Sequence, residues 1–250
     1  VHGCYDELVE LLGKLGYTVE EDRATPPNGR KAIFLGDLVD RGPKIPAVLR
    51  LVMGMVHNGT ALCIPGNHDV KLVRALSGRD VKIAHGLDKS LEQLGRESPE
   101  FREEVREFLD GLVSHFLLDD GKLVVAHGGI KESMQGRASG AVRDFALYGE
   151  TTGETDEFGL PVRMNWAQDY RGKAYVVYGH SPVPEAEWLN RDTPLNQAMI
   201  SGLYTAFADR YGALITPEQR RVCERLVESF DAYLAAEGEP GRPQGLVHGD

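Results

Sequence analysis

Clusters of metal-ligating and phosphate-binding residue types, each beside a glycine, recur along this sequence. The richest is GDLVDRGP at residues 36–43, which holds two aspartates and an arginine, and GNHD follows at residues 66–69. The candidate side chains are His2, Asp37, Asp40, Arg41, Asn67, His68, His127 and His180. Imidazole, amide and carboxylate donors in one set suit borderline divalent ions such as Mn²⁺, Fe²⁺ or Zn²⁺ better than Ca²⁺.

The histidines are the strongest part of this pattern. The chain has eight, and the four in the candidate set belong to glycine-containing clusters at the amino terminus or at predicted strand ends. His57, His85, His115 and His248 do not occupy such positions. One histidine beside glycine is more often structural than a ligand, but four with an aspartate and an asparagine predict a metal centre. Two ions about 3.5–4 Å apart can clamp a phosphoryl oxygen and generate hydroxide at neutral pH. Arg41 offers a fork of donors to phosphate, and a histidine off the metal could protonate the leaving oxygen.

Short apolar runs precede these clusters and read as buried strands. The runs lie at residues 31–35, 61–64, 122–126 and 174–178. Helical spacing marks residues 5–12 and 46–52, residues 18–30 read as a polar loop, and residues 70–118 read as mostly helical. Strands that alternate with helices predict an α/β layered fold. Ligands of such folds bind at the carboxyl ends of the strands, which is where the clusters fall.

Composition limits the classes of function. The 250 residues include 42% hydrophobic ones, and the net charge of −10 argues against a broad nucleic-acid-binding surface but allows a local basic groove. The three cysteines have no CxxC spacing, which fits a reducing compartment. No signal peptide and no apolar run of roughly 18 residues is present, so we expect a cytoplasmic protein that does not bind membranes.

The motifs, in this order and spacing, resemble those of the calcineurin-like metallophosphoesterase superfamily. They are GDxxDRG, GNHD, AHGG and GH, at residues 36–42, 66–69, 126–129 and 179–180. Residues 1–191 are most similar to the phosphatase domain of bacterial polynucleotide kinase-phosphatase, an RNA end-healing enzyme. The segments with this finer similarity are AHGGIKE, YGETTGETDEFGLP and YGHSPVP, which begin at residues 126, 148 and 178.

The resemblance implies a role for each candidate residue. The implied ligands of two divalent ions, with Asp37 as the bridge, are His2, Asp37, Asn67, His127 and His180. The implied catalytic set is His68 as general acid, Asp40 as the residue that orients it, and Arg41 as the phosphate ligand. Arg41, Asn67 and His68 would contact substrate. Mn²⁺ is the expected ion, with Ni²⁺, Fe²⁺ or Zn²⁺ as alternatives.

The resemblance also implies the fold and the substrate. We expect a metallophosphoesterase-type sheet sandwich flanked by helices, which hydrolyses phosphomonoesters and 2′,3′-cyclic phosphates at RNA ends or in small phosphoesters. The loop-rich insert at residues 131–172 would wall the site. Arg137, Arg143 and Arg163 are either contacts to RNA phosphates or solvated surface arginines. The kinase and ligase domains of such a parent protein are not expected here, because no GxxxxGK[ST] loop occurs.

Two departures leave alternatives open. The superfamily motif is Asp-x-His-Gly, and the sequence starts at x, so we expect a fragment without the first strand and its aspartate. The chain could therefore be an inactive fragment or an RNA-end-binding module. A serine/threonine protein phosphatase or a dinucleoside-polyphosphate phosphatase with the same motifs is the enzymatic alternative.

The second departure is the C-terminal segment. Residues 192–250 read as a helical tail, possibly foreign to the rest. From about residue 196 they resemble the stretch before the catalytic loop of aminoglycoside-phosphotransferase-like kinases, with LVHGD at residues 246–250, but no kinase activity is expected. One further hypothesis is that residues 245–247 fill the first-strand position and Asp250 supplies the missing aspartate.

Overall fold

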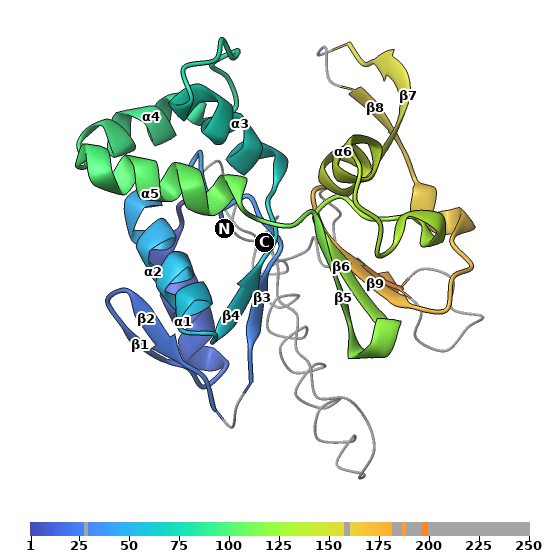
Figure 1. Cartoon of the computed structure of the whole chain (residues 1–250), viewed down its shortest axis with the longest axis horizontal. Helices are drawn as coiled ribbons and strands as arrows, with labels where there is room; N and C mark the ends of the chain where they lie inside the picture. The colour runs from blue at the N-terminus through green and yellow to red at the C-terminus, as the bar shows by residue number, and fades with distance from the viewer. Residues whose placement is uncertain (28–29, 158–160, 182–186, 189–196, 200–250) are drawn as a thin grey trace.

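The computed structural model describes residues 1–27, 30–157, 161–181, 187–188 and 197–199. Its amino-terminal half is helical, and the helices lie on one side of the parallel strands β3 (Ala32–Phe34) and β4 (Ala61–Cys63) (Figure 1). The helices are α1 (Tyr5–Lys14), α2 (Ile45–His57), α3 (Asn67–Leu76), α4 (Leu87–Gly95) and α5 (Pro99–Asp110). One large apolar cluster joins them, because each helix buries a leucine- or valine-rich face.

The other half is built on a five-stranded mixed sheet of order β10-β11-β9-β6-β5. Its strands are β5 (His115–Leu118), β6 (Leu123–Ala126), β9 (Tyr175–Tyr178), β10 (Glu187–Trp188) and β11 (Gln197–Met199). The central strands β6 and β9 run parallel, and β5 closes one end of the sheet antiparallel to β6.

The two sheets pack face to face through a small separate core. Ile33, Leu35 and Ile64 from the β3–β4 side meet Val125 and Val177 from β6 and β9. Alternation along the strands buries these residues between the sheets, as in a sandwich. The predicted α/β sandwich flanked by helices is confirmed.

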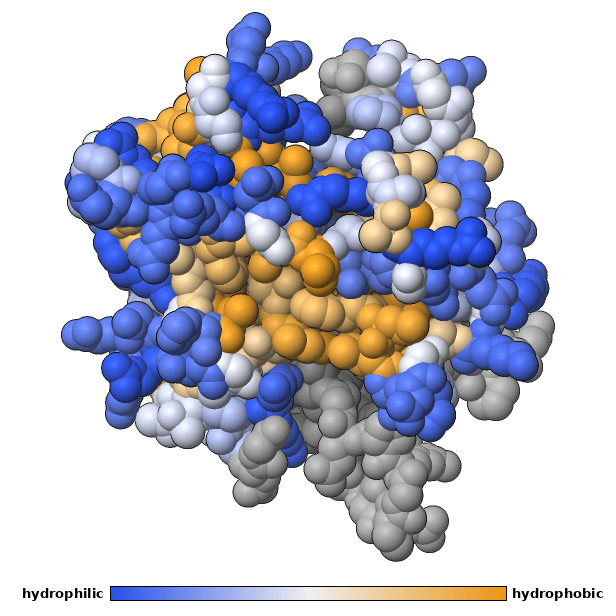
Figure 2. Space-filling view, viewed as in Figure 1, coloured by the Kyte–Doolittle hydropathy of each residue, from blue (hydrophilic) through white to orange (hydrophobic). Residues whose placement is uncertain are grey.

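An apolar band crosses the face shown in Figure 2, between the charged surface of the helices and that of the sheet half. Two large apolar side chains near the start of the sheet half are exposed: Val113, between α5 and β5, is 51% exposed, and Leu117, within β5, is 47% exposed. Within the described residues, no helix is both long enough and apolar enough to cross a lipid bilayer.

Several segments differ from the prediction. A hairpin of β1 (Thr18–Glu20) and β2 (Arg23–Thr25) replaces the expected polar loop, and β5 lies within the stretch predicted as mostly helical. These strands have three or four residues, too few to show a period in the sequence.

The insert at residues 131–172 is more ordered than its sequence suggests. It holds α6 (Gly140–Tyr148), the hairpin of β7 (Glu150–Thr155) and β8 (Pro161–Met164), and 3₁₀ turns at Glu132–Met134 and Trp166–Asp169; another such turn, Asp119–Gly121, precedes the insert. Residues 197–199, predicted to lie in the helical tail, form β11 and pair with β9. The proposed tail helix, residues 245–247 and Asp250 lie outside the described residues.

Candidate metal centre

The loops that follow β3 and β4 touch each other at two glycines. Gly36 has a φ of +81°, and a β-carbon there would lie 2.1 Å from the backbone nitrogen of Gly66. A β-carbon on Gly66 would lie 2.1 Å from the carboxylate of Asp37. Only glycine permits this approach, and the approach brings Asp37 to the amino terminus of α3. There the backbone N–H of His68 donates to Asp37 Oδ1 at 3.1 Å.

The amino terminus is held against the same loop. The backbone N–H groups of His2 and Gly3 donate to the carbonyls of Asp37 and Leu38, at 2.8 and 2.9 Å. A β-carbon on Gly42 would lie 2.1 Å from the His2 carbonyl oxygen, so this contact also requires glycine. The histidine next to the amino terminus is therefore carried to the loop after β3.

Backbone carbonyls fix the orientation of two imidazoles. His2 Nδ1 lies 2.7 Å from the Val39 carbonyl oxygen, and His127 Nδ1 lies 2.6 Å from that of Leu35. A carbonyl can only accept, so Nδ1 carries the proton in both rings and, in the neutral rings, Nε2 presents its lone pair. This is the arrangement that protein metal sites use to aim histidine ligands.

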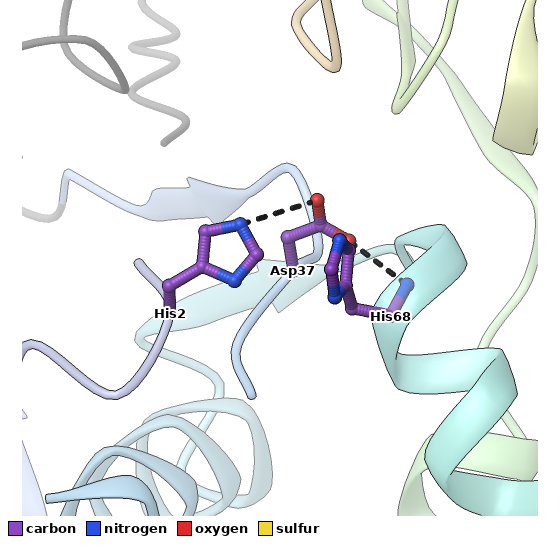
Figure 3. A group of neighbouring side chains, drawn as sticks. All are labelled: His2, Asp37 and His68. Atoms are coloured by element: carbon purple, nitrogen blue, oxygen red, sulfur yellow. Dashed lines mark hydrogen bonds and ion pairs between the residues drawn. The ribbon is translucent and has the colours of Figure 1, made fainter. Parts of the chain in front are cut away.

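His2, Asp37 and His68 form the first group of potential ligand atoms (Figure 3). Their donor atoms all lie within 4.8 Å of one another, and all three residues are buried. His2 Nε2 lies 3.6 Å from Asp37 Oδ2. His68 belongs to this group by position, although the sequence predicted it as an acid and not as a ligand.

Asp37, His127 and His180 form the second group, again with donor atoms within 4.8 Å of one another. His127 Nε2 lies 3.5 Å from Asp37 Oδ2, 3.0 Å from His180 Nδ1 and 3.2 Å from Asn67 Oδ1. The structure thus brings together all five predicted ligand residues, and Asp37 is the one shared by both groups.

This set of atoms fits divalent cations. In the neutral ring, His127 Nε2 is an acceptor, and it faces the oxygen of Asn67 and a carboxylate oxygen of Asp37, which are acceptors too. His180 Nε2 is buried without a hydrogen-bond partner in the described part of the chain. Acceptors crowded in a buried place repel one another unless a cation lies among them.

Burial keeps the imidazoles in the form that binds metals. It lowers the pKa of His180 to about 2, and the neighbouring His127 and Arg163 add to this effect. Burial also lowers the pKa of His2 well below its usual value, against the attraction of Asp37. Burial opposes ionisation of Asp37, but the surrounding histidines outweigh it and hold the pKa of this carboxyl below its usual range. Neutral imidazole and ionised carboxylate are the ligand forms.

His68 has a second partner on its other side. Its Nδ1 lies 2.6 Å from Asp40 Oδ2, and Asp40 is fully buried. Burial acts to lower the pKa of His68, but the hydrogen bond to Asp40 and the charges of Asp37 and Asp40 outweigh it and raise the pKa. Arg41, the predicted phosphate ligand, is the next residue after Asp40 in the sequence and is exposed. The pair predicted from the sequence, an imidazole oriented by Asp40, is present.

Asp69 is a site residue to which the sequence analysis gave no role. Its two carboxylate oxygens accept the backbone N–H groups of Leu38, at 2.9 Å, and Gly66, at 2.8 Å. It therefore ties the loop after β3 to the start of α3. Its place in GNHD, three residues after the helix-capping Gly66, was a signal for this capping contact.

Trp166 contacts both glycines after His127 and leaves no room for a side chain at Gly129. A β-carbon on Gly129 would lie 2.1 Å from the Trp166 ring, and the indole N–H donates to the Gly128 carbonyl at 3.2 Å. The insert is thereby packed against the end of β6. This contact joins residues 37 or more positions apart, and no local sequence pattern marks it.

The three arginines of the insert have different surroundings. Arg163, on β8, donates to the His180 carbonyl at 3.3 Å and to Ser181 Oγ at 2.9 Å, beside the second ligand group. Arg143 donates to the Leu112 carbonyl at 3.1 Å. Arg137 is exposed after a 3₁₀ turn. Of the three, Arg163 is the one whose described hydrogen bonds reach a residue of the site.

An α/β sandwich whose strand ends gather two ligand groups around one shared aspartate defines the class of metal-dependent phosphoesterases. Residues 1–188 match the family model of the calcineurin-like phosphoesterases, and the chain belongs to that family. Members of this family act with divalent metal ions. The superfamily resemblance and the prediction of a metal-dependent phosphoester hydrolase are confirmed.

Curated relatives bear a more specific name. The chain is 38% identical over 244 residues to the asymmetrical bis(5′-nucleosyl)-tetraphosphatase PrpE of Anoxybacillus flavithermus, an alignment that covers 96% of each chain. It is 42% identical over 206 residues to the PrpE of Bacillus subtilis, covering 81% of this chain and 84% of the relative. The finer resemblance to polynucleotide kinase-phosphatase is not supported by these relatives, and neither is RNA repair.

Solved structures support the fold. A putative diadenosine tetraphosphatase aligns with a TM-score of 0.53 at 24% identity, over 80% of this chain and 79% of the other. A yeast serine/threonine phosphatase aligns with the same score at 13% identity, over 80% of this chain and 64% of the other. These comparisons do not support the predicted resemblance of the tail to kinases. The alignment with the Anoxybacillus relative extends into residues 192–250.

Proposed function

We propose that this chain hydrolyses bis(5′-nucleosyl) polyphosphates, and bis(5′-nucleosyl) tetraphosphates in particular, asymmetrically. Water would add across one P–O–P bond, so that its oxygen joins the monophosphate product and a proton goes to the triphosphate that leaves. The proposal is supported by relatives with this name at 38% and 42% identity. The observation that carries the chemistry is the sharing of Asp37 between two groups of ligand atoms.

The residues that would hold the ions follow from these groups. His2 and Asp37 would hold the first ion, with His68 as a further candidate, and the second would lie among Asp37, Asn67, His127 and His180. Mn²⁺ is our first choice of ion. Bound divalent ions supply a nucleophile from water at neutral pH and offset the charge of the phosphoryl group.

The remaining side chains act on the substrate. Arg41 would bind the phosphoryl group that is attacked, together with Asn67. His68 would give a proton to the leaving oxygen, and Asp40 holds its ring in place from the opposite side. Arg163 brings a second guanidinium to the site, which suits a polyphosphate that carries several negative charges.

Hydrolysis at RNA ends is the weaker candidate. It rested on the resemblance to polynucleotide kinase-phosphatase, which the relatives do not share. RNA ends as partners and a cytoplasmic location both stay predictions.

One set of assays separates these functions. The purified chain with Mn²⁺ is incubated with diadenosine tetraphosphate, an RNA 2′,3′-cyclic phosphate or a phosphoserine peptide, and the products are resolved by anion-exchange chromatography. We expect ATP and AMP in equal amounts from the tetraphosphate. ADP as the main product would refute asymmetric cleavage, and faster turnover of either other substrate would refute the substrate class. Asp37→Ala is the negative control.

A further inference from the structure

Helix α4 contacts the loop that carries Asp40 and Arg41 through three polar side chains. Ser90, fully buried, accepts the backbone N–H of Asp40 at 2.8 Å and donates its hydroxyl to Asp40 Oδ1 at 2.5 Å. Lys89 Nζ donates to the Arg41 carbonyl at 2.9 Å. The helix thus holds the loop both by its backbone and by the functional carboxylate.

Gln93, one turn further along α4, makes two more bonds to the same loop. Its Nε2 donates to the Gly42 carbonyl at 2.9 Å, and its Oε1 accepts the N–H of Ile45 at 2.8 Å. The amide thus uses both its donor and its acceptor on backbone groups at this end of the loop. Leu87 and Leu94, both fully buried, anchor α4 in the helical core.

The loop needs external support because its backbone is strained. Asp40 and Arg41 have φ values of 70° and 62°, in the left-handed region that side chains other than glycine rarely adopt. Such residues cost of order 1–3 kcal/mol each and persist only where the surroundings hold them. Gly86, at the start of α4, lies so close that a β-carbon there would be 2.5 Å from the Arg41 nitrogen. The helix therefore begins directly on the strained segment.

We propose that α4 is a positioning helix for the reaction, and that Ser90 is its principal positioning residue, acting on His68 through Asp40. Asp40 uses Oδ1 for Ser90 and Oδ2 for His68, so the hydroxyl of Ser90 sets the plane of the carboxylate that orients the imidazole. Lys89 and Gln93 hold the backbone from which Arg41 projects. The part of this proposal that concerns turnover rests on the proposed function, whereas the part that concerns the hydrogen bonds does not.

The first test reads the hydrogen bonds directly, without activity. The short bond from His68 to Asp40 should give a downfield imidazole N–H proton resonance in the Zn²⁺-loaded protein, assigned by its loss in Asp40→Asn. We expect Ser90→Ala to shift or broaden this resonance. Glu92→Ala, which removes an exposed ion pair with Arg96 from the same helix, should leave it unchanged. An unchanged resonance in Ser90→Ala would overturn the proposal.

The second test is a double-mutant cycle. With diadenosine tetraphosphate, Ser90→Ala should lower kcat about tenfold in the wild-type background, as loss of a bond to a charged group does. In the Asp40→Asn background the same change should cost less than about twofold, because residues that act through one another are not additive. Equal losses in both backgrounds would show a general structural role and refute positioning through Asp40.

Two outcomes are kept apart by this design. If the wild-type chain does not cleave the tetraphosphate, the proposed function fails, and the resonance still tests whether Ser90 positions Asp40 and His68. If Ser90→Ala does not fold, Ser90→Cys replaces it, since a thiol has nearly the same shape and is a weak donor. Ser90→Cys with wild-type kcat and an unshifted resonance would overturn the proposal.

Discussion

The Nε2 atom of His127 lies 3.2 Å from the Oδ1 atom of Asn67, and in the neutral imidazole neither atom has a proton to donate. The Nδ1–H group of His127 donates to the Leu35 carbonyl. The tautomer with its proton on Nε2 would lose that hydrogen bond. A cation between the two acceptors removes their repulsion. Metal binding and removal should therefore affect this part of the fold strongly.

We expect the chain to bind two divalent ions, and Asp37→Ala to lose both, because Asp37 belongs to both ligand groups. His180→Ala should lose one. The measurement is a calorimetric titration with Mn²⁺ after removal of metal by a chelator. His57→Ala, which changes an exposed histidine at the end of α2, is the matched control and should bind two. Two ions on Asp37→Ala would contradict the shared-ligand geometry.

Gly36→Ala should destabilise the protein and weaken metal binding. The new β-carbon meets the Gly66 backbone at 2.1 Å on a residue with a φ of +81°, so the two loops must separate. A loss of at least about 2 kcal/mol in the free energy of unfolding is expected for such a clash. Gly13→Ala is the control, because that helical glycine has open space around it. It should gain about 0.5–1 kcal/mol in urea unfolding. An unchanged midpoint for Gly36→Ala would disprove the close contact.

Asp69→Asn should act in a related way. The amide has one oxygen for the two N–H groups of Leu38 and Gly66, and its NH₂ would face a donor. A buried N–H group left without an acceptor is expected to cost about 1–3 kcal/mol. Asp88→Asn, on the exposed side of α4, serves as the comparison and should stay within about 0.5 kcal/mol. Equal stability of the two variants would argue against the tie between the loops.

The convergence of the metal centre could be predicted from the sequence because its residues follow apolar runs. Strand ends of parallel strands meet at one edge of a sheet, so Asp37 should lie near Asn67, and His127 near His180. The two pairs then meet because the β3–β4 sheet packs face to face on the sheet that holds β6 and β9. The glycines beside them were a further signal, and the structure gives their reason in the contact of Gly36 with Gly66.

The contacts that support the centre could not be predicted in this way. Ser90 is bonded to Asp40 across 50 positions, and Trp166 reaches Gly128 across 38. A serine on a helix and a tryptophan in a loop-rich insert have no spacing that points to such partners. The short strands β1, β2 and β11 were missed because packing, and not local propensity, decides segments of this length.

His68→Ala separates the two roles that its position allows. If His68 is the general acid, the variant binds two Mn²⁺ ions and loses more activity on phenyl phosphate than on p-nitrophenyl phosphate, because phenol is the poorer leaving group. A loss of about 10²–10⁴-fold on the poor leaving group is typical of a missing acid. If the variant binds fewer ions, His68 is a ligand of the first ion, as its place beside His2 and Asp37 also allows.

Arg163→Ala tests whether the insert contributes to substrate binding. Arg163 is held beside His180 by its bonds to the His180 carbonyl and to Ser181, so its charge lies at the edge of the second ligand group. Loss of this charge should weaken the binding of a polyphosphate more than that of a monoester, because the polyphosphate loses a charge-assisted contact to a further phosphate. We expect KM for diadenosine tetraphosphate to rise about tenfold, as for one such contact, with little change in KM for p-nitrophenyl phosphate.

Arg137→Ala, which removes an exposed arginine of the same insert, should leave both KM values unchanged. Steady-state kinetics on the three proteins decides the matter, and an equal rise for both substrates in Arg163→Ala would place this residue at the attacked phosphoryl group and not at a more distant one.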